Sequence, residues 1–313
     1  MRKRCIQSLL LTLFLSNFAL ADKVIGILVP LALPAMDQIV SGYETQLQKT
    51  YPGKIQFLLK NAQGNTQIQQ SILQEFLDQN VDVIAPIGTD ATEMTAHMDK
   101  KNIPIVAIAA ERPKGLDKNA NLTNILDEVS VLTQVNFIHQ AFPNLKKMTV
   151  IYSADDRILA DIKPLQTAAT QVGINVQGLM VQQASDLYTV RSHIDADSQA
   201  IFILKDELVV SGIQTLAKEA NSRKILLIAS DDGSVSGGAA LAFGVKESDI
   251  GIDSAASTLK ILNGSKASDV PGFSMTQYTV FVNPSAAKIQ GVNLADIQKI
   301  SQKQGLSYDV ITD

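Results

Sequence analysis

The chain has 313 residues, 46% of them hydrophobic, and its 27 basic and 31 acidic residues give a formal net charge of −4 at pH 7. After residue 21 no run of Lys or Arg is longer than a pair, and the chain has no Trp, which argues against the basic surface and stacking platforms that nucleic acids require. The single cysteine, Cys5, lies near the amino end, so the rest of the chain is predicted to form no disulfide or thiolate metal site.

Residues 1–21 have the order of charges and apolar residues that is typical of a secretory signal peptide. Arg2, Lys3 and Arg4 precede a mostly apolar stretch at 6–18, and small residues at 19–21 predict cleavage after Ala21. An uncleaved membrane anchor is the alternative, but the apolar stretch is shorter than the roughly 20 residues that a span requires. We therefore expect export of the chain, with the mature protein beginning at Asp22.

The first part of the mature sequence alternates short apolar runs with amphipathic stretches. The predicted elements are strand 24–29, helix 37–49, strand 55–59, helix 66–79, strand 81–84, helix 91–100, and strands 103–108 and 122–126. Strands made almost entirely of Val, Ile and Leu, each followed by a helix, indicate a parallel sheet that is covered on both faces.

The alternation then starts again. The predicted elements are helix 129–141, strand 148–152, helix 160–172, strand 175–179, strand 200–204, helix 208–220 and strand 225–229. Two successive runs of this kind predict an α/β protein with two doubly wound, Rossmann-like lobes. A single (β/α)8 barrel is the alternative that the chain length allows.

Ligands of open parallel sheets bind beyond the carboxyl ends of the strands, which selects candidate residues without any motif. The candidates that follow the predicted strands are Pro34, Asn61, Gly88, Thr89, Asp90, Ala109, Glu111, Ser153, Lys205, Asp206, Ser230 and Asp231. The same residue types also cap helices, and Asp90 with Glu93 has the spacing of a capping box. Each candidate can therefore serve either a ligand or the helix that follows it.

No catalytic arrangement is apparent in the sequence. His97, His139 and His193 belong to no metalloprotease motif, and the glycine-rich stretch 233–238 lacks the Gly-Lys-Ser/Thr ending of a phosphate loop. We therefore predict neither an enzyme nor a cofactor or metal, and a secreted α/β hydrolase is only an alternative.

Short segments along the chain resemble those of a known family. Residues Asn61 to Gly64 follow the second predicted strand and lead into a Gln-rich helix, and 81–84 and 87–89 come next. Further matching segments lie at 103–106, 143–144, 229–231, 237–241, 244–245, 261–264, 269–271 and 282–286. This colinear set resembles the ABC-transporter substrate-binding family of the tryptophan/tyrosine/phenylalanine type, which has the type I periplasmic-binding fold.

The resemblance implies three crossings between the lobes, near 126–127, 244–245 and 277–279. The first lobe would comprise 22–126 plus 246–277, and the second 127–245 plus 278–313. Asp127 at the first crossing joins the candidate site. Gly88, Thr89 and Ser153 would donate hydrogen bonds to a ligand carboxylate, and Asp231, with Asp206 as a second candidate, would hold an ammonium.

The resemblance further implies a periplasmic, monomeric solute-binding component of an ABC importer, which works with a permease in the inner membrane. The ligand would be amino-acid-like, and an aromatic amino acid is one candidate. Two departures from the family pattern, Leu33 and Lys205, leave its identity open, because Lys205 could pair with an anionic ligand group or with Asp206. A periplasmic sensing protein for a membrane receptor is the alternative role.

Overall fold

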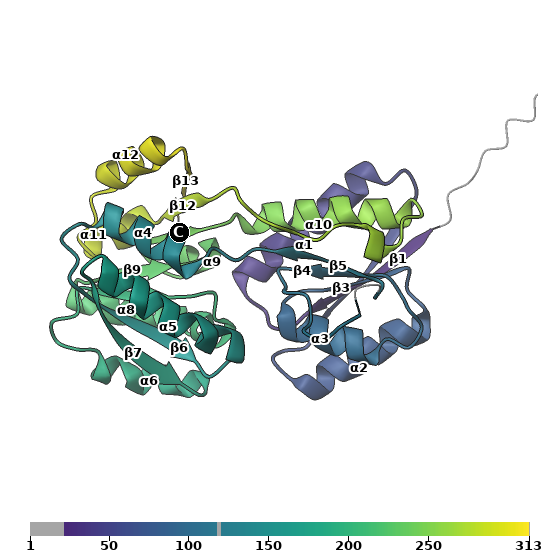
Figure 1. Ribbon diagram of the computed structural model, residues 1–313, viewed down its shortest axis with the longest axis horizontal. Coiled ribbons are helices and arrows are strands. Elements are labelled where there is room, and N and C mark those ends of the chain that lie inside the picture. Colours follow the sequence, from purple (N-terminus) through teal and green to yellow (C-terminus); the bar gives the residue numbers. More distant parts are fainter. Residues whose placement is uncertain (1–21, 118–119, 313) are drawn as a thin grey trace, which may run out of the picture.

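The computed structural model describes residues 22–117 and 120–312, so the predicted signal peptide and its cleavage site lie outside the described residues. Within this part of the chain, no helix is long and apolar enough to cross a membrane. The described residues form two α/β lobes, each built on its own sheet (Figure 1).

The first lobe contains a six-stranded sheet in which every neighbouring pair of strands is parallel. Its strands, in spatial order, are β11 (Phe273–Ser274), β5 (Leu122–Leu126), β4 (Ile105–Ile108), β3 (Val83–Pro86), β1 (Lys23–Val29) and β2 (Ile55–Asn61). Its helices are α1 (Pro34–Thr50), α2 (Thr66–Gln79), α3 (Thr89–Met98), α10 (Glu247–Leu262) and the 3-10 turn η3 (Ala267–Asp269).

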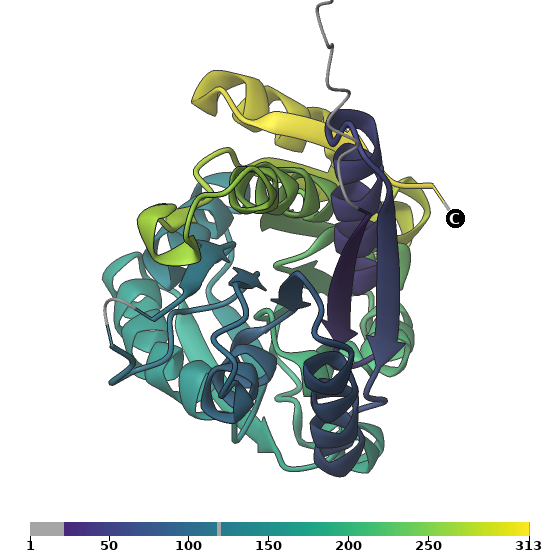
Figure 2. The same cartoon turned by 90° about the vertical axis from the view of Figure 1, so that its right-hand side faces the viewer.

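Helices cover both faces of this sheet, α1 and α10 on one face and α2 and α3 on the other (Figure 2). The alternation of side chains along β1 explains the division. Ile25 and Ile27 join the core under α1, whereas Leu28 joins a separate core that is built around Phe76 of α2. The absence of a side chain at Gly26 leaves room for the Phe76 ring, because a Cβ there would lie 2.7 Å from that ring.

The second lobe contains a seven-stranded sheet that is parallel except for the antiparallel pair β10–β12. Its strands, in spatial order, are β13 (Ser307–Val310), β12 (Thr279–Val282), β10 (Leu241–Gly244), β9 (Leu226–Ala229), β8 (Ala200–Ile203), β6 (Lys147–Ser153) and β7 (Asn175–Val181). Its helices are α4 (Val131–Ala141), α5 (Asp156–Gln171), η1 (Ala184–Asp186), α6 (Leu187–Val190), η2 (Arg191–His193), α7 (Glu207–Val210), α8 (Ile213–Arg223), α9 (Asp232–Ser236), α11 (Pro284–Ile289) and α12 (Leu294–Gln304).

Three segments connect the two lobes (Figure 1). They are residues 127–130 between β5 and α4, 245–246 between β10 and α10, and 275–278 between β11 and β12. Because the chain passes between the sheets three times, α10 and β11 return to the first lobe and the carboxyl-terminal elements return to the second.

The two open sheets confirm the predicted doubly wound fold and rule out the barrel alternative. Most predicted helices shift by two to four residues at an end, among them 91–100, observed at 89–98, and 160–172, observed at 156–171, and two differences have a clear physical reason. The helix predicted at 37–49 begins at Pro34, whose fixed φ suits the first helical position. The helix predicted at 208–220 is divided into α7 and α8, which meet at Gly212, where a Cβ would lie 2.2 Å from the Leu187 side chain.

Candidate ligand-binding cleft

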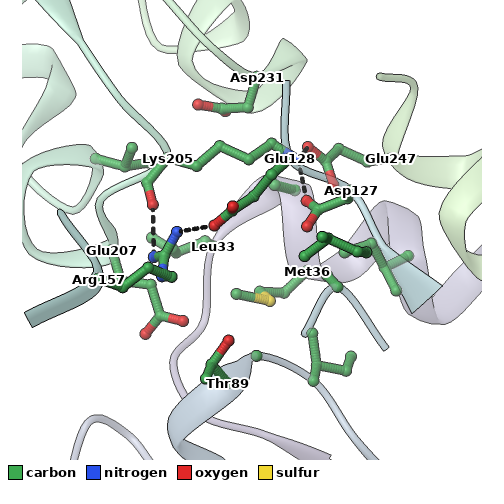
Figure 3. Close-up of a pocket in the computed structure, with 17 residues that line it drawn as sticks. Leu33, Met36, Thr89, Asp127, Glu128, Arg157, Lys205, Glu207, Asp231 and Glu247 are labelled. Carbon is green, nitrogen blue, oxygen red and sulfur yellow. Dashed lines mark hydrogen bonds and ion pairs between the residues drawn. The ribbon is translucent and has the colours of Figure 1, made fainter. Parts of the chain in front are cut away.

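A cavity of about 660 Å³, open to solvent, lies between the two lobes (Figure 3). Its lining residues come from the carboxyl ends of strands in both sheets, from α1 and from the connections. They are Leu33, Ala35, Met36, Ile39, Ile87, Gly88, Thr89, Ala109, Leu126, Asp127, Glu128, Arg157, Lys205, Glu207, Val210, Asp231 and Glu247. Of the residues selected from the sequence, Gly88, Thr89, Ala109, Asp127, Lys205 and Asp231 meet here.

Most of the apolar wall of this cavity belongs to the first lobe. Leu33, Met36 and Ile39 come from the start of α1, and Ile87 and Leu126 follow or end strands of the first sheet. In the described part of the chain, no aromatic side chain lines the cavity. The wall can therefore contact an apolar ligand group, but it offers no ring for stacking.

Helix α3 points its amino end at the cavity. Gly88 is the N-cap residue, with a φ of 90°, and among the described residues no side chain caps this helix. The prediction that Asp90 is the cap is wrong, because Asp90 is the second residue of the helix. Uncapped N–H groups at a helix amino end attract anions, which makes this the place in the cavity that suits a carboxylate.

Lys205 is the centre of a buried ion-pair cluster at the connections between the lobes. Its Nζ pairs with Asp127 and lies 2.7 Å from Glu247 Oε1. Figure 3 shows this cluster, and the prediction that Lys205 neutralises Asp206 is therefore wrong. Burial lowers the pKa of Lys205, but the two carboxylates outweigh burial and raise it, so the lysine is charged.

Asp206 has a different set of partners. Its carboxylate accepts hydrogen bonds from the backbone N–H of Ser153, at 2.6 Å, and from that of Val209, at 3.2 Å, where it caps α7. The Ser153 amide, predicted to donate to a ligand carboxylate, already donates to Asp206. Asp206 and Ser153 thus fix the loop between β8 and α7 against the end of β6.

Asp231 caps the short helix α9 and also lines the cavity. It accepts hydrogen bonds from the N–H and the hydroxyl of Ser234, each at 2.7 Å. Burial raises the pKa of Asp231, and burial together with the Asp231 charge raises the pKa of the neighbouring Asp232 to about 6. Asp232 also accepts a hydrogen bond from Gln38 Nε2 of α1, at 3.2 Å, which joins the two lobes beside the cavity.

Four charged residues that line the cavity were not selected from the sequence, Glu128 and Glu247 at the connections and Arg157 and Glu207 on the second-lobe wall. Arg157, in the first turn of α5, donates to Glu128 at 2.9 Å and to the Lys205 carbonyl at 3.0 Å. Glu207 begins α7, and its Oε1 would lie 3.3 Å from a Cβ on Gly88 of the other lobe. In the sequence Arg157 lies just before the helix predicted at 160–172 and belongs to no motif, whereas Glu207 directly follows Lys205 and Asp206.

The remaining candidates lie around this cavity or outside it. Asp90, Ser153 and Asp206 line a larger adjoining cavity of about 1660 Å³, which shares Gly88, Thr89, Arg157 and Glu207 with the first. Ser230 lines a smaller cavity with Asp127 and Lys205. Pro34, Asn61 and Glu111 line none of these three cavities.

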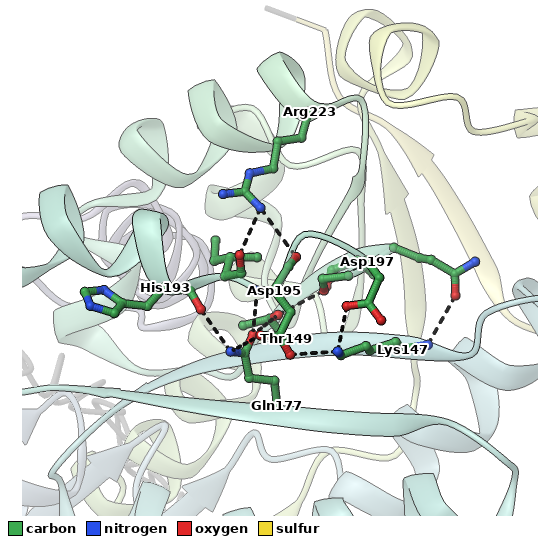
Figure 4. Close-up of polar contacts among 11 residues, drawn as sticks. Lys147, Thr149, Gln177, His193, Asp195, Asp197 and Arg223 are labelled. Carbon is green, nitrogen blue, oxygen red and sulfur yellow. Dashed lines mark hydrogen bonds and ion pairs between the residues drawn. The ribbon is translucent and has the colours of Figure 1, made fainter.

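None of the three histidines lines these cavities. His193 is exposed at the opposite end of the second sheet, beside a polar cluster that anchors residues 191–198 (Figure 4). There Lys147 pairs with Asp195 at 2.7 Å and with Asp197 at 2.6 Å, and Gln177 donates to the His193 carbonyl.

A hydrolase would need a base near a nucleophile in the cleft, and the histidines do not supply one. In residues 22–117 and 120–312, no group of three or more His, Cys, Asp or Glu residues could hold a metal ion.

Comparison with known proteins agrees with this geometry. The model of a family described as ABC transporter substrate binding protein matches residues 24–304. An uncharacterised protein of Rickettsia prowazekii is 34% identical over 281 residues, and the match covers 88% of each chain. A tyrosine-binding protein of Clostridioides difficile is 26% identical and matches 90% of this chain and 83% of its own length. The structure of an ABC domain in complex with L-Trp from Streptococcus pneumoniae superimposes with a TM-score of 0.80 at 21% identity, and covers 93% of this chain and all of that one.

Proposed function

Because this chain belongs to the ABC transporter substrate-binding protein family, we propose that it captures a small, amino-acid-like ligand in the periplasm and delivers it to the permease of an ABC importer. The observation that carries this proposal is the cavity at which the carboxyl ends of strands from both lobes meet. A ligand that contacts both lobes at once favours their approach.

The cavity offers separate places for the two charged groups of an amino acid. The uncapped amino end of α3 suits a carboxylate, and Glu207, whose Oε1 would lie 3.3 Å from a Cβ on Gly88, suits the ammonium on the same carbon. The apolar residues of α1 line the rest of the cavity and suit an aliphatic or aromatic body. The relatives named for tyrosine and for bound L-Trp support an amino acid as the ligand class.

The three connections couple ligand binding to the relative movement of the two lobes. Short connecting segments act as hinges, so a ligand held by both lobes shifts the protein toward a closed form. A permease that recognises the closed form would then receive only loaded protein. The monomer is sufficient for this role, because one chain supplies both walls of the cavity.

The test is to purify the mature chain and to identify co-purified small molecules by mass spectrometry. After dialysis, a panel of amino acids, sugars, nucleosides and carboxylates is screened by thermal unfolding. An amino acid present at 100 times its Kd should stabilise the native state by about 2.7 kcal/mol. If no amino acid raises the melting temperature and none co-purifies, the proposal is wrong.

A cavity variant makes the test specific to this site. Ala35 lines the cavity, so Ala35→Phe should weaken ligand binding by filling part of the space. Ala256→Phe on the exposed face of α10 adds the same ring away from the cavity and should leave binding unchanged. Equal binding by both variants would place the ligand elsewhere.

A further inference from the structure

The cleft between the lobes has a large excess of acidic side chains. Among the described residues, eight carboxylates line the first cavity and the adjoining one, against two cationic side chains, Arg157 and Lys205. The eight are Asp90, Asp127, Glu128, Asp155, Asp206, Glu207, Asp231 and Glu247. A concave surface with one sign of charge concentrates ligands of the opposite charge.

Both cationic side chains already have carboxylate partners. Lys205 pairs with Asp127 and Glu247, and Arg157 pairs with Glu128. The charge of each cation is therefore balanced by at least one carboxylate, which leaves no net positive charge in the cleft for an additional anionic group of a ligand. The amino end of α3 is the anion-binding feature that stays open, and it suits a single carboxylate.

Two carboxylates of the first cavity make no ion pair with any residue that the structure describes. Asp231 is buried and its side chain is hydrogen-bonded to Ser234. Glu207 makes no side-chain hydrogen bond or ion pair to any residue that the structure describes, and burial raises its pKa to about 7. A carboxylate with little access to water and no ion pair destabilises the protein, so a cationic ligand group at either position is favoured.

The positions of these two carboxylates suit the two ends of one ligand. Glu207 lies beside Gly88 at the amino end of α3, where an α-carboxylate and an α-ammonium would lie next to each other. Asp231 lies toward the opposite side of the cavity, and in Figure 3 the Lys205 side chain and the Arg157–Glu128 pair lie between it and Glu207, with Met36 and Leu33 beside them. An aliphatic stem that connects the two carboxylates would therefore run along α1 past this pair.

Given that the proposed function holds, we propose that the cleft selects basic amino acids: the α-carboxylate binds at the amino end of α3, the α-ammonium at Glu207, and the side-chain cation at Asp231. Selectivity for these ligands arises from a second cation that neutral amino acids lack. Acidic amino acids are rejected because their second carboxylate would face the acidic wall.

The test compares pairs of amino acids that share a carbon skeleton and differ in charge. Binding of L-lysine and L-norleucine, and of L-arginine and L-citrulline, is measured by calorimetry on the dialysed mature protein. A charge-assisted hydrogen bond predicts about 10- to 100-fold tighter binding of the cationic member of each pair. L-glutamate should bind more weakly than L-glutamine.

The outcomes separate this proposal from the proposed function. If the neutral or acidic members bind as tightly as the cationic ones, the charge selection is wrong, while amino-acid binding stands. If no amino acid of the panel binds, neutral aromatic ones included, the proposed function itself is wrong.

Two variants test the assignment of the cations. Asp231→Asn can still cap α9 and should reduce the lysine-to-norleucine ratio of affinities toward one, because lysine loses more affinity than norleucine. Glu207→Gln should weaken both ligands equally. Asp78→Asn, an exposed acid on α2, is the control for loss of one negative charge and should change neither affinity. An unchanged ratio in Asp231→Asn would overturn the assignment of the side-chain cation.

Discussion

Lys205 Nζ lies 2.7 Å from Glu247 Oε1 and also pairs with Asp127, so one lysine of the second lobe is joined to the first connection and to the start of α10. Asp127 begins the first connection and Glu247 follows the second. Both carboxylates are buried, with exposed side-chain fractions of 8% and 2%. The cluster therefore fixes the geometry at the base of the cleft, next to the ligand cavity.

Replacement of Lys205 by Met should strongly destabilise the protein. The variant leaves two buried carboxylates without their cation, and loss of one partner of a buried ion pair costs about 3–5 kcal/mol. Urea denaturation at pH 8 measures the change in the free energy of unfolding. The loss should be smaller at pH 5, because burial already raises the pKa of Glu247 and protonation removes its charge.

Lys60→Met is the matched control for this prediction. Lys60 pairs with Glu75 at 2.8 Å on the surface, where both side chains are 39% exposed, and such pairs contribute about 0–1 kcal/mol. Equal losses in the two variants would contradict a structural role for the buried cluster.

Gly88→Ala should weaken both stability and ligand binding. Gly88 has a φ of 90° and a ψ of 157°, a region in which other residues are strained by about 1–3 kcal/mol. A Cβ there would also lie 3.3 Å from Glu207 Oε1, at the place proposed for the ligand carboxylate. Gly115→Ala is the control for this prediction. Gly115 has a φ of 78°, so Ala at this position has the same kind of backbone strain, but no atom lies within 4 Å of the added Cβ. If thermal unfolding and calorimetry show weaker binding in both variants, the effect is not local to the cleft.

Glu207→Gln should stabilise the ligand-free protein at alkaline pH. The ordinary pKa of Glu is 4.5 and that of Glu207 is raised to about 7, so the folded state holds this proton more tightly than the unfolded state does. Stability of the wild type should therefore fall as the pH rises from 4.5 through 7, and the full loss is present above pH 7. The melting temperature of Glu207→Gln should exceed that of the wild type at pH 8 and match it at pH 4. A difference that is independent of pH would contradict this explanation.

Gly251→Ala should destabilise the first lobe by separating α1 from α10. A Cβ on Gly251 would lie 2.1 Å from the Ile39 carbonyl oxygen and 2.7 Å from the Tyr43 nitrogen, which are backbone atoms and cannot turn aside. Overpacking of this kind costs about 1–3 kcal/mol. Ile252→Ala changes the next residue on α10, which is 38% exposed, and should have little effect on chemical denaturation. Comparable stability of the two variants would show that the helices can move apart freely.

The sequence by itself determined the two doubly wound lobes. Apolar runs such as 24–29 and helical spacing such as that of 66–79 are local patterns, and they predict which segments are strands and helices. The rule that ligands lie beyond the carboxyl ends of strands then selected Gly88, Thr89, Lys205 and Asp231, which meet in one cavity.

Only the tertiary structure decided which partners these residues have. Lys205 is adjacent to Asp206 in sequence, yet it pairs with Asp127 and Glu247, which lie 78 and 42 positions away. Asp206 instead holds the Ser153 amide. Sequence spacing cannot reveal such pairs, because ion pairs and hydrogen bonds depend on distance in space, and that distance is set by how the lobes and their three connections pack.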